Sequence, residues 1–160
     1  MQPDNWTRKT KEKRMEKGMS ELERAAAFII EKCGEEGIIV HRYDAKTSRS
    51  IYLKFDFGLG ASLRISDHRG IEKYHYKFNL IQGQNRIVTV RYQNQTYCRY
   101  YPFRDIWTCL HDIILFRKEA IEKHGGITNY FHEMEKIRQR IERLPEEKLH
   151  PFWKHGRRVV

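Results

Sequence analysis

The densest group of side chains that could do chemistry lies at residues 64–68. Arg64, Ser66, Asp67 and His68 fall within five residues, and His75 follows on the next predicted strand. One carboxylate and two imidazoles at adjoining strand ends are ligand types that zinc and related metals bind. The same residues also suit a turn after a strand, because short polar side chains bond to nearby backbone groups. We favour the turn and predict no bound metal.

Other signatures of catalysis are weak in this chain. The eight histidines show neither H-x-x-x-H nor H-E-x-x-H spacing, which a zinc-binding helix requires. Gly58-Leu59-Gly60 connects two predicted strands with no helix after it, unlike a phosphate-binding loop. The three cysteines include no C-x-x-C pair, and we interpret them as small buried hydrophobic residues. We therefore predict no catalytic residue, no cofactor and no enzyme activity.

A second pattern interleaves cations with aromatic rings along the predicted strands. Cations follow phosphates and rings stack on bases, so this combination is typical of proteins that bind single-stranded nucleic acid. The alternative is that the tyrosines pack in the core and the cations only face solvent. The residues assigned to this surface, besides Arg64, are Lys73, Tyr74, Tyr76, Lys77, Arg91 and Arg99.

Positive charge is concentrated in the same part of the chain. The net charge is +10, and residues 41–104 hold 12 Lys and Arg against 4 Asp and Glu. Residues 105–144 hold 7 of each kind and are neutral. Such an asymmetry attracts polyanions or acidic protein surfaces without identifying which.

Short alternating segments predict the sheet that would position these residues. Apolar and polar residues alternate with period two in 51–56, 61–66 and 73–78, and strands 86–91 and 95–101 continue the series. Residues 93–94 form a predicted tight turn, and residues 38–43 are a further candidate strand. We predict an antiparallel sheet of five to six strands.

Three segments have the apolar periodicity of helices. They are residues 20–33, with Ser20 as N-cap and Gly34 as the end, then 103–123 and 128–144. We expect an α+β domain over 20–144 whose helices cover one face of the sheet. Residues 1–19 are a predicted flexible basic arm, and 145–160 a C-terminal tail whose Phe152-Trp153 pair docks on the body or on a partner. No apolar run is long enough to span a membrane.

The segments 62–68 and 73–78 also resemble small proteins carried by phages and other mobile elements. Among these are anti-CRISPR inhibitors of type II-A systems, which have a strand ending in Arg, a branched residue, Ser, a polar residue and His. The resemblance implies a non-catalytic protein that binds a Cas9-type effector nuclease, with or without its guide RNA, and blocks DNA binding or cleavage in the cytoplasm of a bacterial host. Arg64, Ser66, Asp67 and His68 are then the motif residues.

The basic charge limits how such an inhibitor could act. A sheet with this charge cannot imitate DNA phosphates, so it would bind an acidic protein surface or contact DNA or RNA itself. The hypothesis from the resemblance is therefore an effector inhibitor. The alternative is a stand-alone protein that binds single-stranded or structured nucleic acid.

Overall fold

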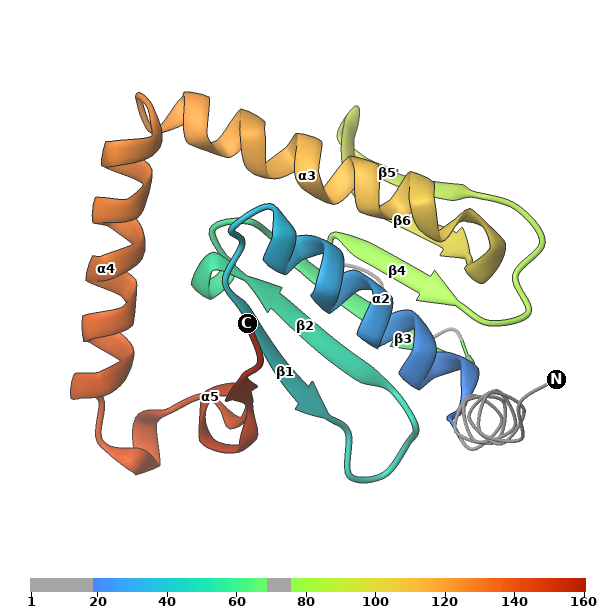
Figure 1. Cartoon of the computed structure of the whole chain (residues 1–160), viewed down its shortest axis with the longest axis horizontal. Coiled ribbons are helices and arrows are strands. Elements are labelled where there is room, and N and C mark those ends of the chain that lie inside the picture. Colours follow the sequence, from blue (N-terminus) through green and yellow to red (C-terminus); the bar gives the residue numbers. More distant parts are fainter. Residues whose placement is uncertain (1–18, 69–75) are drawn as a thin grey trace, which may run out of the picture.

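The computed structural model describes residues 19–68 and 76–160, which form an α+β fold with a seven-stranded mixed sheet (Figure 1). The strand order is β5-β6-β4-β3-β2-β1-β7. The strands are β1 (Val40–Asp44), β2 (Ile51–Phe55), β3 (Ser62–Ser66), β4 (Phe78–Ile81), β5 (Val88–Tyr92), β6 (Gln95–Pro102) and β7 (Arg157–Arg158).

The expectation of a purely antiparallel sheet is wrong. β4 pairs in parallel with both β3 and β6, whereas the other neighbouring strands are antiparallel. A period-two pattern shows which face a side chain occupies, but it does not give the direction of a strand. All four residues of β4 are buried, as in a central strand covered on both faces.

Two predicted segments lie partly or wholly outside the described residues. The predicted strand 73–78 corresponds to β4 only at Phe78, and residues 69–75 are not described. The basic arm, apart from exposed Met19, also falls outside the described part of the chain. Both remain predictions.

Helices α2 (Glu21–Glu35) and α3 (Ile106–Lys123) cover one face of the sheet (Figure 1). Ser20 caps α2 as predicted, because its Oγ accepts a hydrogen bond from the backbone N–H of Glu23 at 3.2 Å. The helix continues past Gly34, and the left-handed residue after it is Gly37, with φ 74°. α4 (Ile127–Arg143) turns away from α3 and runs beside the end of the sheet (Figure 1).

The C-terminal segment adds to the sheet rather than staying irregular. After the 3₁₀ turn Glu146–Lys148, helix α5 (Pro151–His155) buries Phe152 against Tyr43, with ring centroids 5.8 Å apart. β7 then pairs with the outer edge of β1. Docking of Phe152 on the body is thus confirmed.

Most apolar side chains meet between the sheet and α2 and α3, and a smaller cluster forms on the opposite face around Ile81, Cys98 and Tyr100. All three cysteines are buried and free, as predicted, and burial raises the pKa of Cys33 to about 12. Within the described residues, no helix combines the length and apolar character needed to cross a membrane.

Candidate functional site: a polar cavity and a basic hairpin

A chain of hydrogen-bonded polar side chains lies at the carboxyl end of β3. Arg64 is buried, and its Nη2 lies 3.2 Å from His68 Nε2. On the other side of the imidazole, Nδ1 lies 2.9 Å from Asp67 Oδ1. Nη1 of Arg49 lies 3.9 Å from Oδ2 of Asp67. Arg64, Asp67 and His68, which the sequence placed together, are therefore in direct contact.

The geometry indicates which nitrogen of His68 carries the proton. A guanidinium has only donors, so His68 Nε2 must accept from Arg64. Nδ1 then carries the hydrogen and donates it to Asp67. This hydrogen bond is the main reason why the pKa of the Asp67 carboxyl is held below its usual value. Because Arg64 occupies Nε2, this imidazole has no free lone pair to act as a general base.

Ser66 forms the turn that brings His68 back towards Arg64. Its buried Oγ donates to the carbonyl of His68 at 2.6 Å and accepts from the backbone N–H of His68 at 3.1 Å. This is the local bonding by which serine stabilises turns. The turn predicted at Ser66 and Asp67 is confirmed.

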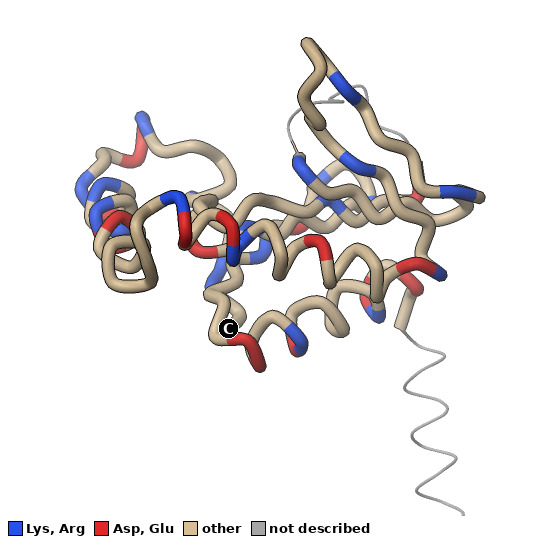
Figure 2. Tube along the Cα trace, turned by 90° about the horizontal axis from the view of Figure 1, so that it is seen from above, with Lys and Arg blue, Asp and Glu red and all other residues tan. Residues whose placement is uncertain are grey.

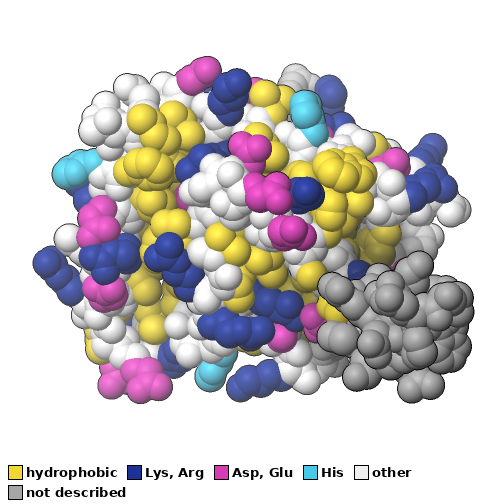
Figure 3. All heavy atoms as spheres, in the orientation of Figure 1, with side chains coloured by type: hydrophobic (Ala, Val, Ile, Leu, Met, Phe, Trp, Pro, Cys, Tyr) yellow, Lys and Arg dark blue, Asp and Glu magenta, His cyan; other side chains and the backbone are white. Residues whose placement is uncertain are grey.

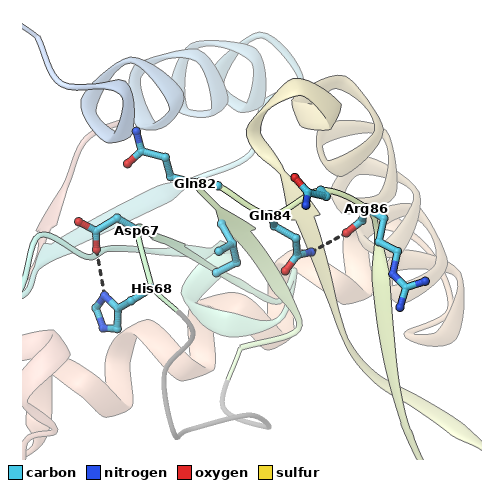
Figure 4. Close-up of a pocket in the computed structure, with 8 residues that line it drawn as sticks. Asp67, His68, Gln82, Gln84 and Arg86 are labelled. Atoms are coloured by element: carbon cyan, nitrogen blue, oxygen red, sulfur yellow. Dashed lines mark hydrogen bonds and ion pairs between the residues drawn. The ribbon is translucent and has the colours of Figure 1, made fainter.

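A cavity of about 390 Å³ opens beside this turn, at the edge where β3 and β4 end (Figure 4). Parallel strands end at the same edge of a sheet, and ligands of open α/β sheets bind outside such carboxyl ends. Asp67 and His68 lie on one side of the site, whereas Gln84 and Arg86 lie on the other (Figure 4). The lining residues are Asp67, His68, Ile81, Gln82, Gly83, Gln84, Asn85 and Arg86.

The cations predicted to share one exposed face do not do so. Arg64 is only 6% exposed and lies on the sheet face opposite α2 and α3, between Tyr52 and Asn79 in the strand register. Arg99 lies on the helix-covered face, where its Nη1 contacts Asp112 Oδ2 of α3 at 2.6 Å. Lys77 is also at α3, with Nζ 5.3 Å from the centre of the Phe116 ring. Alternation along each strand could not reveal these partners from other elements.

The remaining predicted site residues are spread over the sheet. Tyr76 packs against Tyr52, with ring centroids 4.9 Å apart, on the face opposite the main helices. Arg91 is exposed near the end of β5. Lys73 and Tyr74 lie outside the described residues.

The hairpin formed by β5 and β6 does present an exposed basic and aromatic surface. It projects from the rest of the molecule and carries only positive charge (Figure 2). Residues 91–97 are all exposed, and the rings of Tyr92 and Tyr97 meet edge to face with centroids 5.8 Å apart. Gln93 and Asn94 turn the chain with φ of 51° and 62°, as the predicted tight turn requires.

Sequence analysis missed Arg86, which is exposed at the cavity just before β5. A signal for it was present, because residues 73–104 contain six Lys and Arg and no Asp or Glu.

The face over α2 and α3 differs from the hairpin, since acidic, basic and apolar side chains intermingle there (Figure 3).

His75, which the metal hypothesis combines with Asp67 and His68, lies outside the described residues, so that hypothesis stays a hypothesis. Among the residues that the structure describes, no group of three or more His, Cys, Asp or Glu side chains is placed to hold an ion. Comparison with known proteins adds no assignment: no family model matches the chain, and neither a curated protein nor a solved structure does.

Proposed function

We propose that this protein binds single-stranded nucleic acid along the β5–β6 hairpin. The observation that carries the proposal is the seven-residue exposed tip, residues 91–97, which contains Arg91 and the ring pair of Tyr92 and Tyr97. A guanidinium can bind phosphate while the neighbouring ring stacks on a base. No acidic side chain in the hairpin opposes the approach of a polyanion.

The position of β5 supports the same function. β5 is the edge strand of the sheet, and its outer side has no neighbouring strand in the described structure. Arg86 lies near its start and Arg91 near its end, so cations mark both ends of this edge. A single strand lying along β5 would meet a cation, a run of backbone and side-chain polar groups, and then the tyrosine pair.

Binding of labelled single-stranded RNA and DNA, measured by fluorescence anisotropy at two salt concentrations, tests the proposal. Arg91→Gln should weaken binding to all sequences and reduce the slope of log affinity against log salt by about 1. Tyr92→Ala should weaken binding by about 1–3 kcal/mol if the ring stacks on a base. Arg140→Gln and Trp107→Ala remove an exposed cation and an exposed ring from the helices, and both should bind like the parent protein.

The proposal is wrong if the parent protein shows no salt-dependent binding, or if the helix variants lose as much affinity as the hairpin variants. A parallel capture experiment with a Cas9-type effector, with and without guide RNA, tests the inhibitor that the sequence resemblance predicts. Salt-resistant capture of the effector together with no affinity for free nucleic acid would favour that inhibitor. Its motif residues Arg64, Ser66 and His68 bond to one another here, which gives them a role in the fold as well.

A further inference from the structure

We infer that the cavity between the ends of β3 and β4 binds one nucleotide, with the base towards Asp67 and the phosphate at Arg86. The inference rests on the proposed function and assigns it a second contact site. The cavity volume of about 390 Å³ is within the usual range for sites that hold small ligands.

The lining of the cavity has two chemically different sides. Asp67 supplies a carboxylate on the β3 side, whereas Arg86 supplies a guanidinium on the β5 side (Figure 4). Gln82, Gln84 and Asn85 also line the cavity, where Gln82 Nε2 donates to Glu21 of α2 and Gln84 Nε2 donates to the backbone carbonyl of Arg86. A ligand that matches this lining has N–H donors at one end and an anionic group at the other, as a nucleotide does.

The Asp67 carboxylate is suited to accept a hydrogen bond from the N–H donors of a base. Its Oδ1 is bonded to His68, while Oδ2 lies 3.9 Å from Nη1 of the exposed Arg49, the one side-chain cation near it among the described residues. The lowered pKa keeps this carboxyl ionised and therefore acceptor-only at neutral pH. Carboxylates recognise bases through their amino groups, as with N4 of cytosine.

Arg86 is suited to hold the phosphate. Its side chain is exposed, and its backbone carbonyl accepts a hydrogen bond from Gln84 Nε2 at 2.8 Å, which fixes the connection from β4 to β5. Gly83 takes a left-handed φ of 81° at the start of this connection. The turn thereby allows Gln84 and Arg86 to line the same cavity.

The cavity also lies next to the hairpin. Arg86 lines the cavity two residues before β5 begins, and Tyr92 is the last residue of that strand. An end nucleotide, or one unstacked from the strand bound at the hairpin, could enter the cavity. A free mononucleotide presents the same chemistry, so the experiment must separate these two sources.

Isothermal titration calorimetry of the full chain with GMP, CMP, UMP, the nucleoside cytidine and ribose 5-phosphate tests the inference. We expect CMP to bind at least tenfold more tightly than ribose 5-phosphate. Arg86→Gln should weaken CMP at least fivefold and leave cytidine unchanged. Asp67→Asn should weaken GMP and CMP more than UMP, because the amide nitrogen repels their amino groups. Arg140→Gln is the matched charge control and should change nothing.

Asp67 and Arg86 are both exposed, so these variants should fold, and unchanged urea unfolding midpoints would verify this. The inference is overturned if ribose 5-phosphate binds as tightly as CMP, if no mononucleotide binds, or if Arg140→Gln has the same effect as Arg86→Gln. If an oligonucleotide binds the hairpin but neither a mononucleotide nor an oligonucleotide end protects the cavity amides in NMR spectra, the cavity site is wrong and the proposed function stands. If mononucleotides bind but oligonucleotides do not, the proposed function is wrong and the cavity site stands.

Discussion

Two buried charged side chains, Asp56 directly after β2 and Arg64 on β3, differ in how their charge is satisfied. Asp56 is fully buried, and its Oδ2 accepts from Arg117 Nε and from the Tyr130 hydroxyl, both at 2.6 Å. Its Oδ1 accepts from the backbone N–H of Ile39 at 3.0 Å. Arg64 is 6% exposed, yet among the described residues its Nε has no hydrogen-bond partner and its side-chain partner is the imidazole of His68.

The Asp56 charge stabilises the fold, whereas the Arg64 charge lies beside a candidate site. Asp56 joins the residue before β1, helix α3 and helix α4 at one point, and the left-handed φ of 50° at Asp56 and 58° at Phe57 is tolerated there. Within the described residues, the Arg64 side chain bonds to His68 of the turn that follows its own strand. A buried polar group that does not make all its hydrogen bonds needs an explanation other than stability. For Arg64, that explanation is that it holds His68 at the cavity.

The largest effect is expected from Asp56→Ala. It leaves the half-buried Arg117 guanidinium and the buried Tyr130 hydroxyl without their acceptor, so the free energy of unfolding should fall by about 3–5 kcal/mol. Urea denaturation followed by circular dichroism measures the change. Asp105→Ala removes a partly exposed carboxylate 3.9 Å from Arg104 and should change little. Equal effects of the two variants would contradict the assigned role of Asp56.

Ser66→Ala should have an intermediate effect. The variant loses two hydrogen bonds with His68 and leaves its backbone groups unpaired, at a cost of about 1–2 kcal/mol in unfolding free energy. Nucleotide binding should weaken too, since His68 lines the cavity. Ser62→Ala, on the same strand, is the control, and a Ser66 variant as stable as this control would show that the turn forms without the hydroxyl.

A smaller, pH-dependent effect is expected at His41, whose buried Nδ1 has no hydrogen-bond partner among the described residues. Burial, followed by the nearby Arg158, lowers the pKa of His41 in the folded protein. The unfolded chain then binds the proton first, so stability should fall as the pH drops below about 6.5 and level off below the folded pKa. His41→Phe should flatten this part of the profile of urea midpoint against pH, and an identical slope in both proteins would contradict the assignment.

The smallest effect on stability is expected from Arg64→Met. Because no carboxylate is left unpaired, the free energy of unfolding should change by less than about 1 kcal/mol. Binding of CMP should nevertheless weaken severalfold, because His68 loses the donor that fixes its imidazole. A loss of stability comparable to that of Asp56→Ala would abolish the distinction between the two charges.

Much of the architecture could be predicted from the sequence, since it depends on local patterns. The α+β class, the Ser20 cap and the turn at Gln93 and Asn94 were predicted from residue types a few positions apart. The parallel pairing of β4 was not, because it depends on which distant strand the segment meets. The seventh strand, Arg157–Arg158, is too short to show any periodicity.

The candidate site, like the fold, could be predicted only where it depends on residues close together in the sequence. The turn at Ser66 and Asp67 is local and was found, whereas the cavity also needs Gln82 to Arg86, which only the parallel register of β3 and β4 brings alongside. Arg99 and Lys77 show why alternation alone misplaces cations. Arg99 bonds to Asp112 and Lys77 lies over the Phe116 ring, both on α3, and no pattern within a strand reports a partner from another layer.

The pairing of β7 with β1 has a consequence for the order of folding. His41 pairs with Arg158, so this contact closes a loop that spans most of the chain. Contacts between such distant residues form slowly, and the outer edge of β1 therefore stays open until late in folding. An open strand edge can pair with another molecule, so concentrated refolding should produce aggregates that dilution suppresses.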